Sequence, residues 1–187
     1  MTVRPRHMGQ GRTGEGSLGR QALAHADALY RFARRLTGDE ADAEDLVQET
    51  FTRALGAAER FEPGTDLRAW LFRILRNLSL DARRRERRHP TVAEAPLEAL
   101  EAREGAPLLG DPELDRLRGV VARDLERALA SLPEAWRALV LLRLEGLGDQ
   151  ELAEVMACPV GTVKSRLARA RAELRQRLRP YARKAAP

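Results

Sequence analysis

The sequence predicts an all-α protein of two small helical domains joined by a flexible acidic linker, the second domain ending in a helix-turn-helix. The first observation is composition, since Ala, Leu, Arg and Glu abound and only 4% of the 187 residues are aromatic. Such a composition favours helices. The second is periodicity, because apolar residues recur every three to four positions and no run alternates as a strand would. The third is an acidic segment rich in proline that separates two periodic stretches.

These patterns divide the chain into five segments. Residues 1–17 are predicted to form a flexible tail, because they are rich in Gly, Arg and Thr and almost lack large apolar side chains. The first domain spans 18–88, the linker 89–117 and the second domain 118–180. A C-terminal tail, 181–187, completes the chain.

The first domain opens with two helices. One runs from about Leu18 to near Gly38, and its apolar residues share a face: Leu29, Phe32, Ala33 and Leu36. The next runs to about Ala57 and is capped either by Thr37 with Glu40 or by Asp39. Its predicted inner face consists of Val47, Phe51, Ala54 and Ala58. Its outer face is acidic.

A turn and a long third helix complete this domain. The turn FEPGTD spans 61–66, and Asp66 can cap the helix that follows. The spacing predicts a buried stripe of Leu67, Trp70, Leu71, Ile74, Leu75 and Leu78. A helical projection at about 100° per residue places three polar residues on another stripe: Arg73, Asn77 and Arg84. The run RRRERR at 83–88 then adds five cations against one anion.

The segment between the two domains has its own composition. From His89 to Asp115 it contains four prolines and seven acidic residues, with Arg103 as the single cation. This pattern predicts a linker whose negative charge opposes the basic elements on both sides of it.

The second domain begins with a helix predicted around Val120 to Ala130. Ser131 and Glu134, with a proline between them, fit a capping box that opens another helix through Leu144.

The most informative stretch is DQELAEVMACPVGTVKSRLARARAELRQRL at 149–178, which reads as a helix-turn-helix. Pro159 ends the first helix and permits only the start of a second. The apolar stripe of the second helix is Val163, Leu167, Ala170, Leu174 and Leu178. Seven cations lie largely outside that stripe, against the single anion Glu173: Lys164, Arg166, Arg169, Arg171, Arg175, Arg177 and Arg179. A solvated helix would mix charges of both signs, so this asymmetry favours DNA over an inert surface.

Catalytic and metal chemistry find no support in the sequence. His7, His25 and His89 are isolated, and the single cysteine, Cys158, excludes an internal disulfide and a cysteine-based zinc site. Three glycines of the tail match a dinucleotide-binding motif, namely Gly9, Gly11 and Gly14. No predicted strand precedes them, so the motif lacks its structural context. With no nucleophile elbow or P-loop either, we expect no enzyme, no cofactor and no metal. No apolar run is long enough to span a membrane and no signal core is present, so we expect a cytoplasmic protein.

Two motifs stand in order along the chain: DAEDLVQETF at 42–51 and CPVGTVKSRLARAR at 158–171. Together they resemble bacterial RNA polymerase sigma factors of the extracytoplasmic function (ECF) group. The resemblance covers 25–88 as the region 2 domain and 120–178 as the region 4 domain. It implies an alternative sigma factor that binds core RNA polymerase, directs it to −10 and −35 promoter elements and assists melting. It also implies an anti-sigma factor as a partner.

The resemblance further implies roles for individual residues. The core polymerase would be bound by Asp45, Leu46, Gln48 and Glu49. The −10 element would be bound by Phe61, Arg73, Arg76, Asn77 and Arg84, with Phe61 and Asn77 framing a flipped base and the arginines following the backbone. The −35 element would be read by Lys164, Ser165, Arg166 and Arg169. Trp70 is assigned to the core instead, and Ala157 stands in the turn where helix-turn-helix motifs favour glycine.

Two other classes of protein fit the sequence less well. A stand-alone transcriptional regulator would need a sensor or dimerisation domain in the first half, but that half carries DLVQE and no sign of a ligand pocket. A helical adaptor would leave both basic elements unexplained. An inert, solvated acidic face remains an alternative for Asp39, Asp42 and Glu44.

Overall fold

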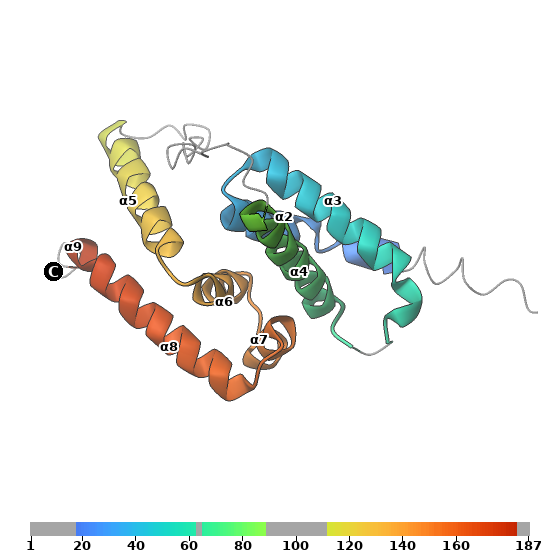
Figure 1. Cartoon of the computed structure of the whole chain (residues 1–187). Coiled ribbons are helices and arrows are strands. Elements are labelled where there is room, and N and C mark those ends of the chain that lie inside the picture. The colour runs from blue at the N-terminus through green and yellow to red at the C-terminus, as the bar shows by residue number, and fades with distance from the viewer. Residues whose placement is uncertain (1–17, 63–64, 89–111, 183–187) are drawn as a thin grey trace, which may run out of the picture. The chain divides into compact units, whose positions relative to one another are not determined.

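The structure, a computed structural model, describes residues 18–62, 65–88 and 112–182. Its ordered elements over these residues are helices, with no strand, so the predicted all-α fold is confirmed (Figure 1). The chain separates into two compact units, Met1–Thr91 and Val92–Pro187. The N-terminal tail, most of the predicted linker and the last five residues lie outside the described residues.

The first unit contains a short helix at 18–23, followed by α2 (Ala26–Thr37), α3 (Glu40–Gly56), the 3-10 turn η1 (Ala58–Arg60) and α4 (Leu67–Arg88). Gly38 ends α2 with φ 83°, a left-handed conformation that costs glycine little. Of the two predicted caps for α3, Asp39 is the one used, since its Oδ1 accepts the Asp42 N–H at 3.0 Å.

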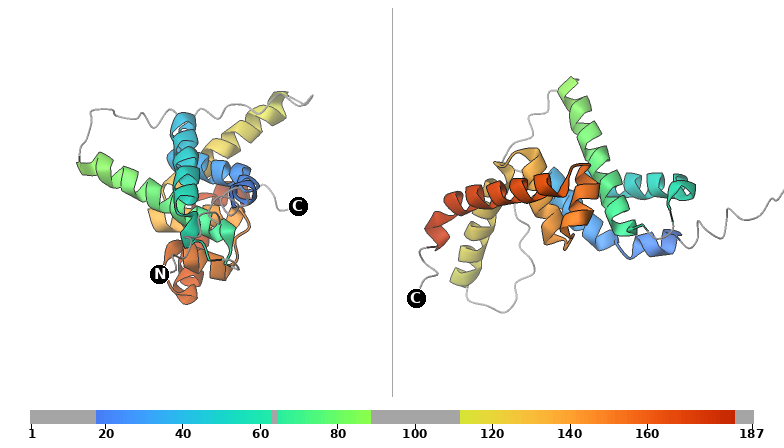
Figure 2. Two further views of the ribbon diagram at one scale, coloured as in Figure 1. Left: turned by 90° about the vertical axis from the view of Figure 1, so that its right-hand side faces the viewer. Right: turned by 90° about the horizontal axis from the view of Figure 1, so that it is seen from below.

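Helices α2, α3 and α4 pack against one another around an apolar core (Figure 2). The predicted face of α2 is confirmed, because all four of its residues are buried: Leu29, Phe32, Ala33 and Leu36. Phe32 meets Phe72 of α4 edge to face, with ring centroids 5.4 Å apart. Phe72 lies outside the stripe predicted for α4, yet it is fully buried.

The predicted inner face of α3 was partly wrong. Ala54 is buried as expected, but the other buried residues are Ala43 and Thr50, while Val47 and Phe51 are half-buried. Thr50 can lie inside because its hydroxyl donates to the Leu46 carbonyl at 2.7 Å, which leaves no unsatisfied polar group.

The second unit contains α5 (Pro112–Ala130), α6 (Glu134–Leu144), α7 (Asp149–Met156), α8 (Val160–Arg177) and the short α9 (Arg179–Ala182). Helix α5 begins earlier than the predicted start near Val120, inside the segment assigned to the linker. Pro112 suits the first turn of a helix, where no N–H is needed.

The capping box predicted before α6 was wrong. The Ser131 hydroxyl donates to the Ala128 carbonyl at 2.7 Å, so it serves the end of α5. Pro133 is the N-cap residue, and its carbonyl accepts the N–H groups of Trp136 and Arg137 at 2.8 and 3.0 Å.

The predicted helix-turn-helix is confirmed as α7 and α8. Between them Ala157 adopts φ 50°, ψ 49°, the left-handed conformation for which such turns favour glycine. Pro159 then starts α8. The first three residues of the predicted stripe are buried, namely Val163, Leu167 and Ala170. The last two, Leu174 and Leu178, are half-buried.

Candidate functional site

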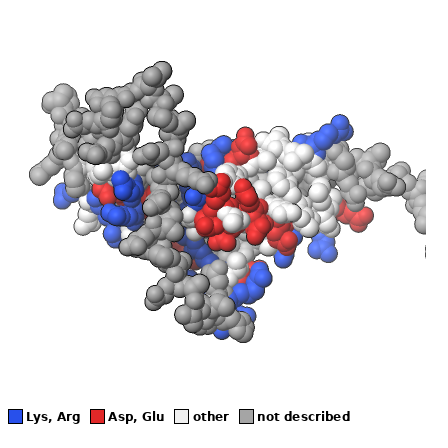
Figure 3. All heavy atoms as spheres, turned by 90° about the horizontal axis from the view of Figure 1, so that it is seen from above, with Lys and Arg blue, Asp and Glu red and all other residues white. Residues whose placement is uncertain are grey.

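Helix α3 carries a polar face opposite its buried one. Three of the four residues assigned to polymerase binding, Asp45, Gln48 and Glu49, are exposed, and Leu46 is half-buried at the edge of the core. Seen from above, acidic side chains gather on the surface of the first unit that α3 presents (Figure 3). The structure therefore brings these residues together on one accessible helix face.

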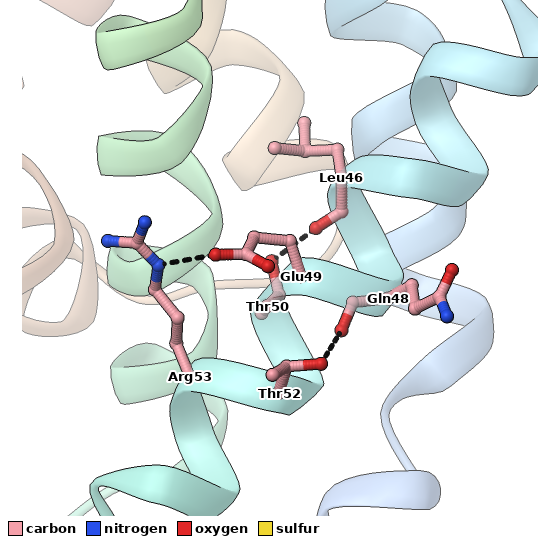
Figure 4. Close-up of polar contacts among 6 residues, drawn as sticks. All are labelled: Leu46, Gln48, Glu49, Thr50, Thr52 and Arg53. Atoms are coloured by element: carbon pink, nitrogen blue, oxygen red, sulfur yellow. Dashed lines mark hydrogen bonds and ion pairs between the residues drawn. The ribbon is translucent and has the colours of Figure 1, made fainter.

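The Glu49 side chain of this face is held within α3 itself (Figure 4), since its Oε1 accepts from Arg53 Nε at 2.8 Å. The Thr52 hydroxyl donates to the backbone carbonyl of Gln48 at 2.9 Å. The Gln48 amide extends outward from the helix (Figure 4). Sequence reasoning missed Arg53, although the Glu–Arg spacing of four residues could have identified it.

The turn before α4 holds an aromatic pair. Phe61 and Trp70 are both half-buried, with ring centroids 5.2 Å apart and planes tilted by 49°. Asp66 caps α4 as predicted, its Oδ1 accepting the Ala69 N–H at 3.1 Å. The assignment of Trp70 to the core needs correction, because the indole lies at the edge of the buried stripe and packs on Phe61 instead of being enclosed.

A basic stripe runs along α4 beside this pair. Arg73, Asn77 and Arg84 are exposed and lie on one face of the helix, as the projection predicted. Arg84 Nη1 is 3.5 Å from Asp81 Oδ1 at the surface. Arg76 is half-buried and has a polar contact of its own.

Arg83 differs from the other cations of the 83–88 run. Its Nη2 donates to the Leu36 carbonyl at 2.7 Å, so it satisfies a backbone acceptor in the last turn of α2. One of the five cations thus has a role within the fold of the first unit, which the sequence did not indicate.

The four residues assigned to −35 reading lie on the first turns of α8. Ser165 and Arg169 are exposed on the face opposite Val163, and Lys164 and Arg166 flank that face on its two sides. Small residues, Gly161, Ala168 and Ala172, are exposed on the same face and permit close approach to a partner. Lys164 Nζ lies 3.9 Å from Asp149 Oδ2 of α7.

The far end of α8 is organised differently. Arg177 pairs with Glu173 at 2.9 Å, and the Tyr181 hydroxyl donates to Asp124 of α5. This hydrogen bond raises the pKa of Tyr181, because ionisation would remove the proton that Asp124 accepts. Tyr181 belongs to α9, so this hydrogen bond joins α9 to α5, whereas the Arg177–Glu173 pair lies within α8 itself.

Across the part of the chain that the structure describes, no group of three His, Cys, Asp or Glu residues could hold a metal ion. Within the same residues, no helix is both long and apolar enough to cross a membrane. Cys158 is a free thiol, half-buried in the turn of the helix-turn-helix.

Comparison with known proteins assigns both units. Residues 22–89 match the family model of sigma-70 region 2, and residues 122–174 match that of sigma-70 region 4. The chain belongs to the sigma-70 family, in its ECF group. It is 38% identical to the ECF sigma factor EcfG of Rhodopseudomonas palustris over 160 residues, which cover 84% of this chain and 83% of EcfG. It is 35% identical to the ECF sigma-E factor of Escherichia coli K12, covering 76% and 77% of the two chains.

A third relative is longer than this sigma factor. The ECF sigma factor SigE of Mycolicibacterium smegmatis is 40% identical over 157 residues, which cover 82% of this chain but only 58% of SigE.

Two solved structures resemble this one as well. The sigma factor RpoE of Bartonella quintana, solved with the anti-sigma factor NepR, aligns with a TM-score of 0.68 at 31% identity, covering 86% of this chain and 95% of that one. CnrH, solved with the cytosolic domain of CnrY, aligns with a TM-score of 0.64 at 27% identity, covering 91% and 92%. The ECF sigma factor is accordingly a transcription initiation factor without catalytic chemistry.

Proposed function

We propose that this alternative sigma factor divides its work among three helix faces: α3 binds core RNA polymerase, α4 captures the −10 element and the first turns of α8 read the −35 element. The observation that carries the proposal is charge placement. An exposed acidic face on α3 lies in the same unit as the exposed basic stripe of α4, while the exposed face of α8 is basic. The acidic surface suits a protein partner, and the basic surfaces suit a nucleic acid.

Helix α3 suits a protein partner that carries cations. Asp45 and Glu49 present carboxylates and Gln48 an amide, and these groups can pair with Arg or Lys across an interface. Charge pairs at an interface fix its register, while the half-buried Leu46 adds apolar contact. Core polymerase is the partner we assign to this face.

Helix α4 and the turn before it suit a melted strand. An unstacked base needs an aromatic surface and a polar group for its edge, which Phe61, backed by Trp70, and Asn77 supply. The exposed Arg73 and Arg84 can follow the phosphates, and Arg76 lies at the edge of the same stripe.

Helix α8 suits the major groove. Its exposed early side chains, Lys164, Ser165 and Arg169, with Arg166 on the flank, occupy the positions from which a recognition helix reads base edges. Arginine and lysine pair with guanine in that groove.

We further propose an anti-sigma factor as a regulator, as in the complex of the sigma factor RpoE with the anti-sigma factor NepR. Because core polymerase and promoter DNA are the partners assigned here, we place the protein in the cytoplasm.

The deciding experiment is reconstitution. Purified chain is mixed with bacterial core polymerase, the complex is isolated at moderate salt, and promoters are selected from a randomised library by run-off transcription. The proposal expects a stable complex and transcription that core polymerase alone does not give. DNA binding without a core complex would instead identify a stand-alone regulator.

A further inference from the structure

Asp149 is an acidic residue beside the start of α8, where the exposed early side chains assigned to DNA are basic or polar. It is the first residue of α7 and half-buried, and its carboxylate faces two cations from two other helices. Oδ1 accepts a hydrogen bond from Arg143 Nη2 at the end of α6. Oδ2 lies 3.9 Å from Lys164 Nζ on α8.

The two contacts differ in character. Arg143 is two-thirds enclosed, its side chain being 33% exposed, and its Nε is buried without a hydrogen-bond partner among the described residues. Asp149 is therefore the polar group that fixes this guanidinium, and the guanidinium in turn fixes the carboxylate. The Lys164 side chain is 67% exposed, so it is held only by charge and can leave.

We infer that Asp149 is a specificity-determining residue. Its carboxylate competes with DNA phosphates for the ammonium group of Lys164, so that Lys164 contributes to binding mainly through base edges. The inference rests on the proposed reading role of Lys164. A free surface lysine binds any phosphate and so strengthens binding to all DNA alike. A lysine beside a fixed carboxylate gains little from a phosphate, because the carboxylate already neutralises it and repels that phosphate. A guanine edge, with two acceptors and no net charge, does not meet this repulsion.

The other acidic residues of α7 do not share this position. Glu151 accepts the N–H of Gly148 and so serves the start of its own helix. Glu154 is exposed on a different face of α7 and supplies a matched control, because Glu154→Gln and Asp149→Asn change the net charge equally.

The test uses the holoenzyme formed with core polymerase and fluorescence anisotropy on duplexes with the preferred −35 sequence and with a scrambled one, at several salt concentrations. Asp149→Asn keeps a carbonyl acceptor for Arg143. It should strengthen binding to the scrambled duplex, steepen its salt dependence by about one unit and reduce discrimination roughly two- to five-fold, the range of an exposed ion pair. Glu154→Gln should leave discrimination unchanged. Equal effects of the two variants would overturn the inference, since net charge alone would then explain them.

A double-mutant cycle with Lys164→Met identifies the partner through which Asp149 acts. In the Lys164→Met background, Asp149→Asn should have no further effect on discrimination, and an undiminished effect would refute the coupling. Lys164→Met alone, at an exposed site that cannot endanger folding, should reduce discrimination while changing the salt slope on scrambled DNA by well under one unit. A change of a full unit in that salt slope would also refute the inference.

The same data separate this inference from the proposed function. If Lys164→Met and Arg169→Ala both leave discrimination intact, the reading role of α8 is wrong. If only Asp149→Asn leaves it intact, the reading role stands and the inference alone fails.

Discussion

Reversing two charges on α3 should strongly weaken polymerase binding without unfolding the first unit. The double variant Asp45→Lys, Glu49→Lys places two cations on the exposed acidic face. The Glu49–Arg53 pair is lost, but both its side chains are about half exposed, at 48% and 55%. An exposed pair of this spacing contributes only about 0.3–0.5 kcal/mol, and the new Lys–Arg repulsion costs a similar amount. The free energy of unfolding should therefore fall by about 1 kcal/mol at most.

The effect on binding should be larger. Close charge pairs across protein interfaces are worth about 1.5 kcal/mol or more each. Losing two such pairs weakens binding by about 3 kcal/mol, which is roughly 100-fold in Kd.

The assay is anisotropy of the labelled sigma factor titrated with core polymerase, with circular dichroism as the check on helical content. The matched control is Glu44→Lys, Glu59→Lys, which makes the same change in net charge at exposed positions away from the centre of this face. Wild-type affinity in a folded Asp45, Glu49 variant would refute the assignment of α3, and so would an equal loss in the control.

Three further predictions concern the other surfaces. Phe61→Ala and Asn77→Ala should impair open-complex formation on duplex promoters, and this defect should be smaller on templates mismatched at −10, because the cost of unpairing is then removed. Permanganate footprinting on both templates checks this, and equal defects on the two would mean that these residues only maintain the fold. Arg169→Ala should lose about 1–3 kcal/mol on the preferred −35 sequence and flatten discrimination, whereas Arg177→Ala should weaken all sequences alike and lower the salt slope by about one unit at most. Ala157→Gly should stabilise the second unit by about 0.5–1 kcal/mol, because relief of the left-handed alanine exceeds the added entropy of the unfolded chain; thermal denaturation checks this, and a lower Tm would contradict it.

Periodicity and turn chemistry predicted much of the fold because they act locally. The spacing of Leu29, Phe32 and Leu36 alone identifies a buried helix face, and Gly38 and Pro159 mark helix boundaries through their backbone preferences. The same local rules placed Asn77 and Arg169 on exposed faces, as the structure has them.

Other features depend on contacts that sequence spacing does not encode. Thr50 reads as polar, and only its bond to the backbone of its own helix permits burial. Phe72 is buried because Phe32 of another helix covers it. The pairing of Asp149 with Lys164 joins residues 15 positions apart through the geometry of the turn between α7 and α8.

The proposed function requires that α4 and α8 contact different promoter elements, one as a melted strand and the other as duplex. Photo-crosslinking from single positions tests it most directly, with a crosslinker at position 77 or 169 of the sigma factor in the open complex. Position 77 should crosslink to the non-template strand at −10, and position 169 should crosslink to the −35 duplex. Crosslinks from both positions to one element, or from position 77 to the −35 duplex, would contradict it.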